Sequence, residues 1–215
     1  MFHTLMLTPH LFDQRYMRTD LDVINDRHSA TKDERLKAAG RELVKTKDYD
    51  KAQAMVASLM RQSPLLREMV ATPGMKTEVS GYVVEPETML PCRWRADAVH
   101  DAYEAMVDFK TAEDVTERAF GNAAARYRYH WQAGSYQHLA PLSGLWHPRN
   151  FLFVALEKDA PYLVEVYEIH PNDVDQGREM FLGYLRRWAD CARKGEFPGL
   201  ATERPTMLQL PTWRE

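Results

Sequence analysis

The chain has 215 residues, of which 45% are hydrophobic and 27% charged, as is usual for a globular protein with one sizeable core. The formal net charge is −3, which excludes a globally basic protein, so any contact with nucleic acid must come from a local patch. The two cysteines, Cys92 and Cys191, are too few for a disulfide framework or for the four thiolates of an iron–sulfur cluster. Their number favours a reducing compartment.

The chain shows neither a membrane span nor a secretory signal. Its apolar runs are shorter than the ~20 residues that a spanning helix needs. The first residues lack a basic segment followed by an apolar one. We therefore expect a cytoplasmic protein without a membrane partner.

The first 75 residues are predicted to be mainly helical. Thr31, with Glu34 three residues later, has the pattern of a helix N-cap. Residues 13–33 are polar and are predicted to be irregular up to that cap. Helices are predicted over residues 2–7, from Thr31, from about Tyr49 to Met60, and from Pro64 to Val70.

Residues 76–215 are predicted to be the core of the same single domain. Strands are predicted over residues 77–85, 90–98, 105–110, 150–156 and 162–169. A long helix is expected from Ala123 to Leu139, after a break at Gly121-Asn122. Another helix is expected to begin at Asp173 or Asp175 and to end at Pro198-Gly199, before an extended tail. This order indicates an α/β fold with a mixed central sheet flanked by helices.

An acidic residue and an Asp-x-Lys motif lie on consecutive predicted strands. Asp108 and Lys110 point to the same face of a strand because side chains alternate with a period of two. A hairpin turning over residues 99–103 would bring Asp97 beside Asp108. Two close carboxylates repel each other unless a cation lies between them, and oxygen ligands suit Mg²⁺ or Mn²⁺. This pattern is typical of enzymes that cleave phosphodiesters, although a surface ion pair between Asp108 and Lys110 is the simpler alternative.

Four motifs together carry a family resemblance: Arg95-Ala96-Asp97, Val107-Asp108-Phe109-Lys110-Thr111, the helical Gln132-x-x-x-Tyr136, and Phe2-His3-Thr4-Leu5-Met6-Leu7-Thr8-Pro9. In these motifs the chain resembles the PD-(D/E)XK nucleases, and within them the RecE-like (exodeoxyribonuclease VIII-type, RecB-branch) exonucleases of phages and prophages. Segments at 151–168 and 208–213 also look like this family. The resemblance implies a restriction-endonuclease-like core preceded by a helical N-terminal segment.

The resemblance also implies roles for individual residues. Asp97, Asp108, the Phe109 carbonyl and His3 would bind Mg²⁺, with Mn²⁺ as an alternative, and Lys110 and Gln132 would position the attacking water or offset charge.

Further candidates each have a simpler alternative. Glu78 would approach the metal or pair with Arg95. Tyr136 would contact the site or DNA, or pack in the core. Thr111 is a further candidate through its place in the motif. Arg126 and Arg128 would bind DNA phosphates or form a solvated face. The tryptophans at 94, 131, 146 and 188 are expected in the core or at interfaces.

By resemblance, the substrate would be linear double-stranded DNA. One strand would be degraded from 5′ to 3′ to leave 3′ overhangs for recombination. The partners would be DNA ends, a RecT-like annealing protein and further copies of the chain in a toroidal tetramer. The alternatives are an endonuclease on the same fold, and a catalytically weak phage accessory protein that binds DNA ends. The second arises because family members usually carry more chain before the motif histidine. An iron–sulfur nuclease of the CRISPR-associated kind is disfavoured by the cysteine count.

Overall fold

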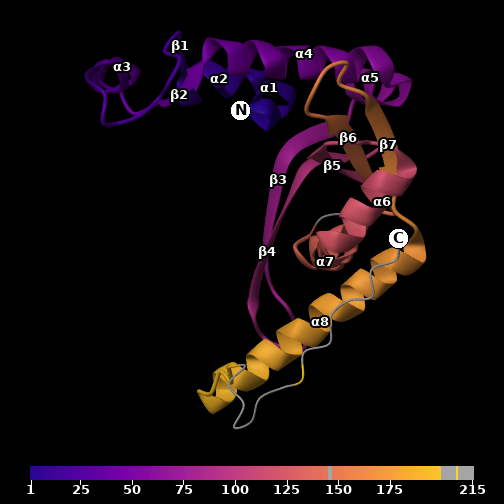
Figure 1. Cartoon of the computed structure of the whole chain (residues 1–215). Helices are drawn as coiled ribbons and strands as arrows, with labels where there is room; N and C mark the ends of the chain where they lie inside the picture. The colour runs from indigo at the N-terminus through magenta and orange to yellow at the C-terminus, as the bar shows by residue number, and fades with distance from the viewer. Residues whose placement is uncertain (145–146, 200–206, 208–215) are drawn as a thin grey trace.

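The computed structural model describes residues 1–144, 147–199 and Met207 (Figure 1). Trp146 and the family-like segment at 208–213 lie outside these residues. The N-terminal elements are α1 (Phe2–Leu7), the 3₁₀ helix η1 (Pro9–Leu11), α2 (Phe12–Arg15), β1 (Tyr16–Thr19), α3 (Ser29–Ala38), β2 (Glu42–Lys45), α4 (Thr46–Gln62) and α5 (Pro64–Ala71). There follow β3 (Met75–Val84), β4 (Pro91–His100), β5 (Ala105–Ala112), α6 (Glu117–Arg126), α7 (Tyr129–Leu142), β6 (Asn150–Glu157), β7 (Val164–Glu168) and α8 (Pro171–Lys194).

A five-stranded mixed sheet forms the centre, in the order β3-β4-β5-β6-β7. Only β5 and β6 run parallel, and the other neighbours are antiparallel. Strand β6 is nearly continuous in apolar residues, and β5 is buried from Ala105 to Phe109, as expected of strands covered on both faces. The predicted α/β fold with a mixed sheet flanked by helices is confirmed.

The two faces of β6 show how the helices cover the sheet. Phe151 and Phe153 pack in a core with residues of α7 and α8, whereas Leu152 and Val154 pack with α1, α4 and α5. This alternation follows from the two-residue period of a strand. Figure 1 shows α4 and α5 on one side of the sheet, and α7 and α8 on the other. None of the helices within the described ranges is long and apolar enough to cross a membrane.

Strand β4 leaves β5 after a short pairing. It pairs with β3 along nearly its whole length, but with β5 only from Ala98↔Val107 to His100↔Ala105. Strand β5 continues beside β6 up to Ala112. The β3–β4 hairpin therefore extends away from the remaining strands, toward α8 (Figure 1). The sheet opens at the positions that follow the last pair, Asp97 and Asp108.

Several local predictions in the N-terminal part are wrong. Strand β1 lies in the segment that was expected to be irregular, and it pairs in parallel with β2. Helix α3 begins at Ser29, and the Thr31 hydroxyl accepts a hydrogen bond from the amide of Asn25 instead of capping the helix. Helix α4 begins at Thr46, three residues before the expected start at Tyr49.

The predicted helix from Ala123 to Leu139 is two helices. Gly121 lies inside α6, and the break falls at Tyr127 and Arg128, where Arg128 has a left-handed backbone with φ of 57°.

The predicted caps of the last helix are also wrong. His170 is its N-cap, with Nδ1 accepting a hydrogen bond from the amide of Asn172, and the helix ends at Gly195, with φ of 69°. Left-handed backbone favours glycine at such an end.

Helices α7 and α8 cross at two glycines. A Cβ atom at Gly134 would collide with the backbone of Val174 and Arg178, and one at Gly177 with the backbone of His130. The two helix backbones therefore touch, which holds α7 against both α8 and the sheet.

Gly177→Ala should destabilise the fold by about 1–3 kcal/mol, because the added methyl group forces two backbones apart. Gly183→Ala on the same helix is the matched control, because open space surrounds that position. It should stabilise by about 0.5–1 kcal/mol through helix propensity. Urea unfolding measures both, and equal effects would contradict the crossing.

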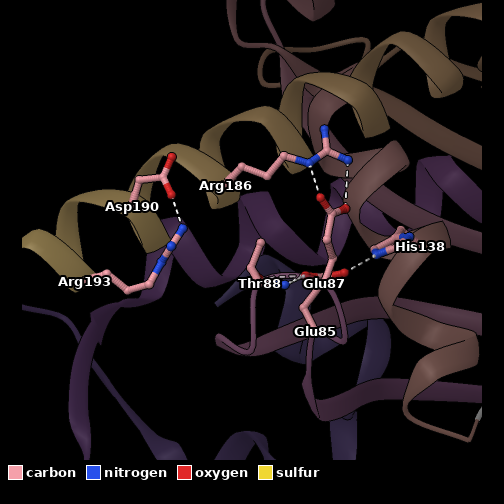
Figure 2. A network of polar contacts seen from close by, with 7 residues as sticks. All are labelled: Glu85, Glu87, Thr88, His138, Arg186, Asp190 and Arg193. Carbon is pink, nitrogen blue, oxygen red and sulfur yellow. Dashed lines mark hydrogen bonds and ion pairs between the residues drawn. The ribbon is translucent and has the colours of Figure 1, made fainter.

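The tip of the β3–β4 hairpin is tied to α7 and α8 (Figure 2). The buried Glu85 carboxylate accepts hydrogen bonds from the amide and hydroxyl of Thr88 at 2.8 and 2.6 Å, and its Oε1 lies 3.6 Å from Nε2 of His138 on α7. Glu87 forms a two-pronged ion pair with Arg186 on α8, at 2.5 and 2.8 Å. Burial acts to raise the pKa of Glu85, but the hydrogen bonds from Thr88 and Glu87 outweigh it and lower that pKa.

Because this pKa is lowered in the folded state, ionised Glu85 stabilises the fold above its unfolded-state pKa of about 4.3, and this contribution is lost as pH falls through the folded-state pKa. Glu85→Gln should therefore unfold about 1 kcal/mol more easily at pH 7, since neutral hydrogen bonds replace charge-assisted ones. The difference should shrink in acid.

Urea unfolding at pH 7 and in acid measures it, with Glu113→Gln, at an exposed position outside this network, as the control for the loss of one carboxylate. A pH-independent difference would contradict the assignment.

Candidate active site

The predicted acidic residues lie where β4 and β5 separate. Asp97 on β4 is placed opposite β5, and its Oδ2 accepts a hydrogen bond of 2.8 Å from the backbone amide of Phe109. This side-chain bond satisfies a backbone donor of β5 beyond the last paired residues, Ala98 and Val107. The hairpin expected from the sequence does bring Asp97 to the strand that carries Asp108.

Asp108, Lys110 and Gln132 form a closed polar triangle. The Lys110 ammonium lies 2.6 Å from Asp108 Oδ2 and donates a hydrogen bond of 2.9 Å to Gln132 Oε1. The amide of Gln132 in turn donates to Asp108 Oδ1 at 2.5 Å. The two strand residues share a face, as the two-residue period predicts, and Gln132 reaches them from α7.

Burial governs the charge of Asp108, whose residue is only 4% exposed. Burial raises the pKa of this carboxyl, the nearby charge of Asp97 adds to the rise, and Lys110 opposes it. Asp108 Oδ2 lies against the Lys110 ammonium and has no other polar partner among the described residues. A carboxylate oxygen has a second lone pair, which could bind a metal ion.

His3 reaches the same place from α1. Its Nε2 lies 3.1 Å from the Phe109 carbonyl oxygen and 3.5 Å from Asp97 Oδ2. The hydrogen bond with Asp97 raises the pKa of His3, although partial burial acts against it. Helix α1 is held by its buried leucines and by the Thr77 hydroxyl, which donates to the Leu7 carbonyl at 2.9 Å. The short helix is thereby fixed on the sheet.

These atoms fit one divalent cation in their chemistry. An imidazole nitrogen, a carboxylate oxygen and a backbone carbonyl converge at His3, Asp97 and Phe109, a set that suits Mn²⁺ or Mg²⁺. Within the described ranges, no group of three or more His, Cys, Asp or Glu side chains is close enough to bind a metal by itself. The Phe109 carbonyl is therefore needed as a ligand, because the Asp108 carboxylate faces Lys110 and Gln132. Asp108 would become a further ligand if its side chain rotated to point one oxygen at the cation.

The remaining candidates near the strands occupy different surroundings. Glu78 forms an ion pair with Arg95, which is the simpler of the two roles considered for Glu78. Tyr136 packs near the rings of Trp94 and Phe151, with centroids 6.2 and 6.3 Å away, and it also contacts Gln132. Tyr136 therefore links the side chain of Gln132 to the core.

The candidates farther from Asp97 and Asp108 lie in different places. Thr111 is exposed and lines a hollow beside the site. Arg126 lines the same hollow, whereas Arg128 donates a hydrogen bond of 3.3 Å to the Tyr184 hydroxyl on α8. The two arginines therefore do not form one cluster.

The sequence analysis missed one residue in contact with the site. Tyr129 has its ring centroid 4.8 Å from the Lys110 ammonium. Burial and the charge of Asp108 raise the pKa of its hydroxyl. The signal was its position three residues before Gln132, which places both on one side of a helix.

An Asp and an Asp-x-Lys on diverging strands, with a helical Gln closing on them, define the PD-(D/E)XK class of domain. The chain belongs to the family described as "PDDEXK-like domain of unknown function (DUF3799)", whose model matches residues 1–205. Comparison with curated proteins found no match.

Two solved structures are similar to this chain. One is described as "Putative exonuclease" from Eubacterium rectale, with 15% identity, a TM-score of 0.54, and coverage of 85% of this chain and 72% of that one. The other is SSO0001, with 15% identity, a TM-score of 0.37, and coverage of 93% of this chain and 87% of that one. At this identity the first comparison supports the fold alone, and the second has too low a score for further use.

Proposed function

We propose that this protein is a metal-dependent deoxyribonuclease that hydrolyses phosphodiester bonds in linear double-stranded DNA from its ends. The observation that carries the proposal is the Asp108–Lys110–Gln132 triangle beside Asp97 and His3. Family membership supports nuclease chemistry on this fold. The name of the Eubacterium rectale protein adds an exonuclease as the type of activity to test first.

Each side chain has a role that follows from its contacts. A divalent cation held by Asp97, His3, the Phe109 carbonyl and Asp108 would activate water and stabilise charge on the phosphate. Lys110 is held by Asp108 and Gln132, so its ammonium is oriented to offset negative charge that develops on the scissile phosphate. Gln132 positions both charged groups and can orient a water molecule through its amide.

The resemblance to RecE-like exonucleases leads to a more detailed proposal. Digestion would run from 5′ to 3′ and leave 3′ overhangs for recombination. A RecT-like annealing protein would bind those overhangs, and the nuclease would assemble as a toroidal tetramer around DNA. End-labelled substrates and the mass of the protein in solution test these two parts separately.

Mn²⁺ should raise the melting temperature of the wild-type protein, because a ligand that binds only the folded state stabilises it by about 2.7 kcal/mol at 100 times its Kd. His3→Gln and Asp97→Asn should lose most of this shift. Thermal unfolding with MnCl₂ or EDTA measures it. Asp190→Asn, in an exposed ion pair on α8, is the control and should keep the wild-type response. An equal shift in Asp97→Asn would remove that residue from the metal site.

In Mg²⁺, the protein should release nucleotides from linear duplex DNA, and EDTA should abolish the release. Lys110→Ala should reduce the rate by about 10²–10³-fold, as for loss of one group that stabilises transition-state charge. Substrates labelled at the 5′ or 3′ end report the direction. Lys76→Ala, which removes an exposed lysine on β3, is the control.

The same assay separates the alternatives. Cutting of covalently closed circular DNA would indicate an endonuclease. Binding to DNA ends by folded protein without release in Mg²⁺ or Mn²⁺ would indicate an end-binding protein and refute the nuclease proposal.

A further inference from the structure

A hollow of about 660 Å³ adjoins the candidate active site on the side of Lys110. It lies between the end of β5, helix α6 and the turn after β6. Tyr129 belongs to both places, because its ring lines the hollow and also faces the Lys110 ammonium at 4.8 Å. Thr111, which follows Lys110, lines it as well. A volume of this size is within the usual range for small-ligand sites.

An exposed aromatic ring stands at this hollow. Tyr127 is 62% exposed and lies at the break between α6 and α7. Its ring is nearly parallel to that of Tyr129, with an interplanar angle of 21° and centroids 5.9 Å apart. Exposed aromatic rings next to a nucleic-acid site offer a surface on which bases of any type can stack.

Two cations lie at the same hollow. The Arg126 guanidinium is 5.6 Å from the centroid of the Tyr127 ring. Lys158 also lines the hollow, and its backbone amide donates a hydrogen bond of 3.0 Å to the Ala112 carbonyl, beside the end of β5. In the part of the chain that the structure describes, neither cation forms an ion pair with a carboxylate.

The rim of the hollow also carries negative charge, at Glu113 and Asp114. Asp114 accepts a hydrogen bond of 2.8 Å from the Thr116 amide, which fixes it in the turn before α6. A phosphate is repelled by this part of the rim and attracted by Arg126 and Lys158. A bound anion is therefore expected beside Arg126 and Lys158 and away from Glu113 and Asp114.

We propose that this hollow binds one unpaired nucleotide of a DNA strand, with its base stacked on Tyr127 and an adjacent phosphate between Arg126 and Lys158. The nucleotide must be unpaired because a paired base is covered on both faces within the duplex. The inference rests on the proposed function and adds to it: the strand separates from its complement beside Lys110.

The larger hollow of the molecule, of about 800 Å³, is a weaker candidate for DNA. It lies at β1 and β2, where Arg18 and Arg41 are accompanied by Asp13, Asp20 and Glu34, and the catalytic candidates do not line it. Its acidic residues outnumber its two arginines, which disfavours an anion, and Lys110 does not line it.

The test uses the full chain in EDTA, so that binding is measured without hydrolysis. The probe is a single-stranded DNA octamer with 2-aminopurine, whose fluorescence falls when the base stacks. Wild type and Tyr127→Phe should quench it, whereas Tyr127→Leu should lose the quenching and bind about 5- to 100-fold more weakly, as for removal of one stacking ring.

Arg126→Gln and Lys158→Gln should each weaken binding and each lower the salt-dependence slope by about 0.7, as for one phosphate contact on a single strand. Tyr82→Leu and Lys76→Gln, at exposed positions on β3, are the matched controls and should behave as wild type.

Two results would overturn the proposal: unchanged quenching by Tyr127→Leu, or equal quenching of the same probe in a fully paired duplex. Tyr127-dependent binding of heparin, a polyanion without bases, would also overturn it. The outcome is separable from that of the nuclease assay. Quenching that depends on Tyr127 supports the subsite even if Mg²⁺ gives no nucleotide release, and release with no quenching refutes the subsite alone.

Discussion

The structure depends on placing two carboxylates and one ammonium together at a partly buried point of the sheet. Asp108 is 4% exposed, and a lone buried carboxylate would be costly, so Lys110 and Gln132 close around it. Asp97 is accommodated because β4 leaves β5 at that point, and its carboxylate takes the Phe109 amide that the ladder no longer satisfies. The site therefore forms at the point where the sheet opens.

The parts that keep this opening in place lie far from it in the sequence. The β3–β4 hairpin is anchored at its tip by Glu85 near α7 and by the pair of Glu87 with Arg186 on α8. Helix α7 is itself held by the backbone contact at Gly134 and Gly177. The same two helices thus support β4, which carries one acid, and present the glutamine that holds the other. A change at this crossing would move both sides of the site together.

The sequence predicted the central sheet and the meeting of Asp97, Asp108 and Lys110 because these follow from local rules: apolar runs and the two-residue period. The place of His3 came from the family resemblance and not from such a rule. It did not predict β1 and β2, which are four residues each and pair across a long intervening segment, so the pairing leaves little local pattern. It placed the helix break at Gly121-Asn122, but Gly121 lies inside α6 and the break falls near Arg128, which adopts the left-handed backbone. The hollow with Tyr127 and Lys158 joins elements that are distant in sequence, and no spacing rule connects them.

The arrangement of charge also explains how a chain with net charge −3 could act on DNA. On the proposed function, Asp97 and Asp108 would repel a phosphate until a divalent cation offsets them, so affinity at the cleavage point would depend on the metal. Arg126 and Lys158 need no such cation, and they line the hollow that adjoins Lys110 at Tyr129. Binding of the strand and cleavage would then use separate charges. Lys110 lies between the two sets. On the proposed function, this division would let DNA be held while the metal exchanges, without a basic surface over the whole molecule.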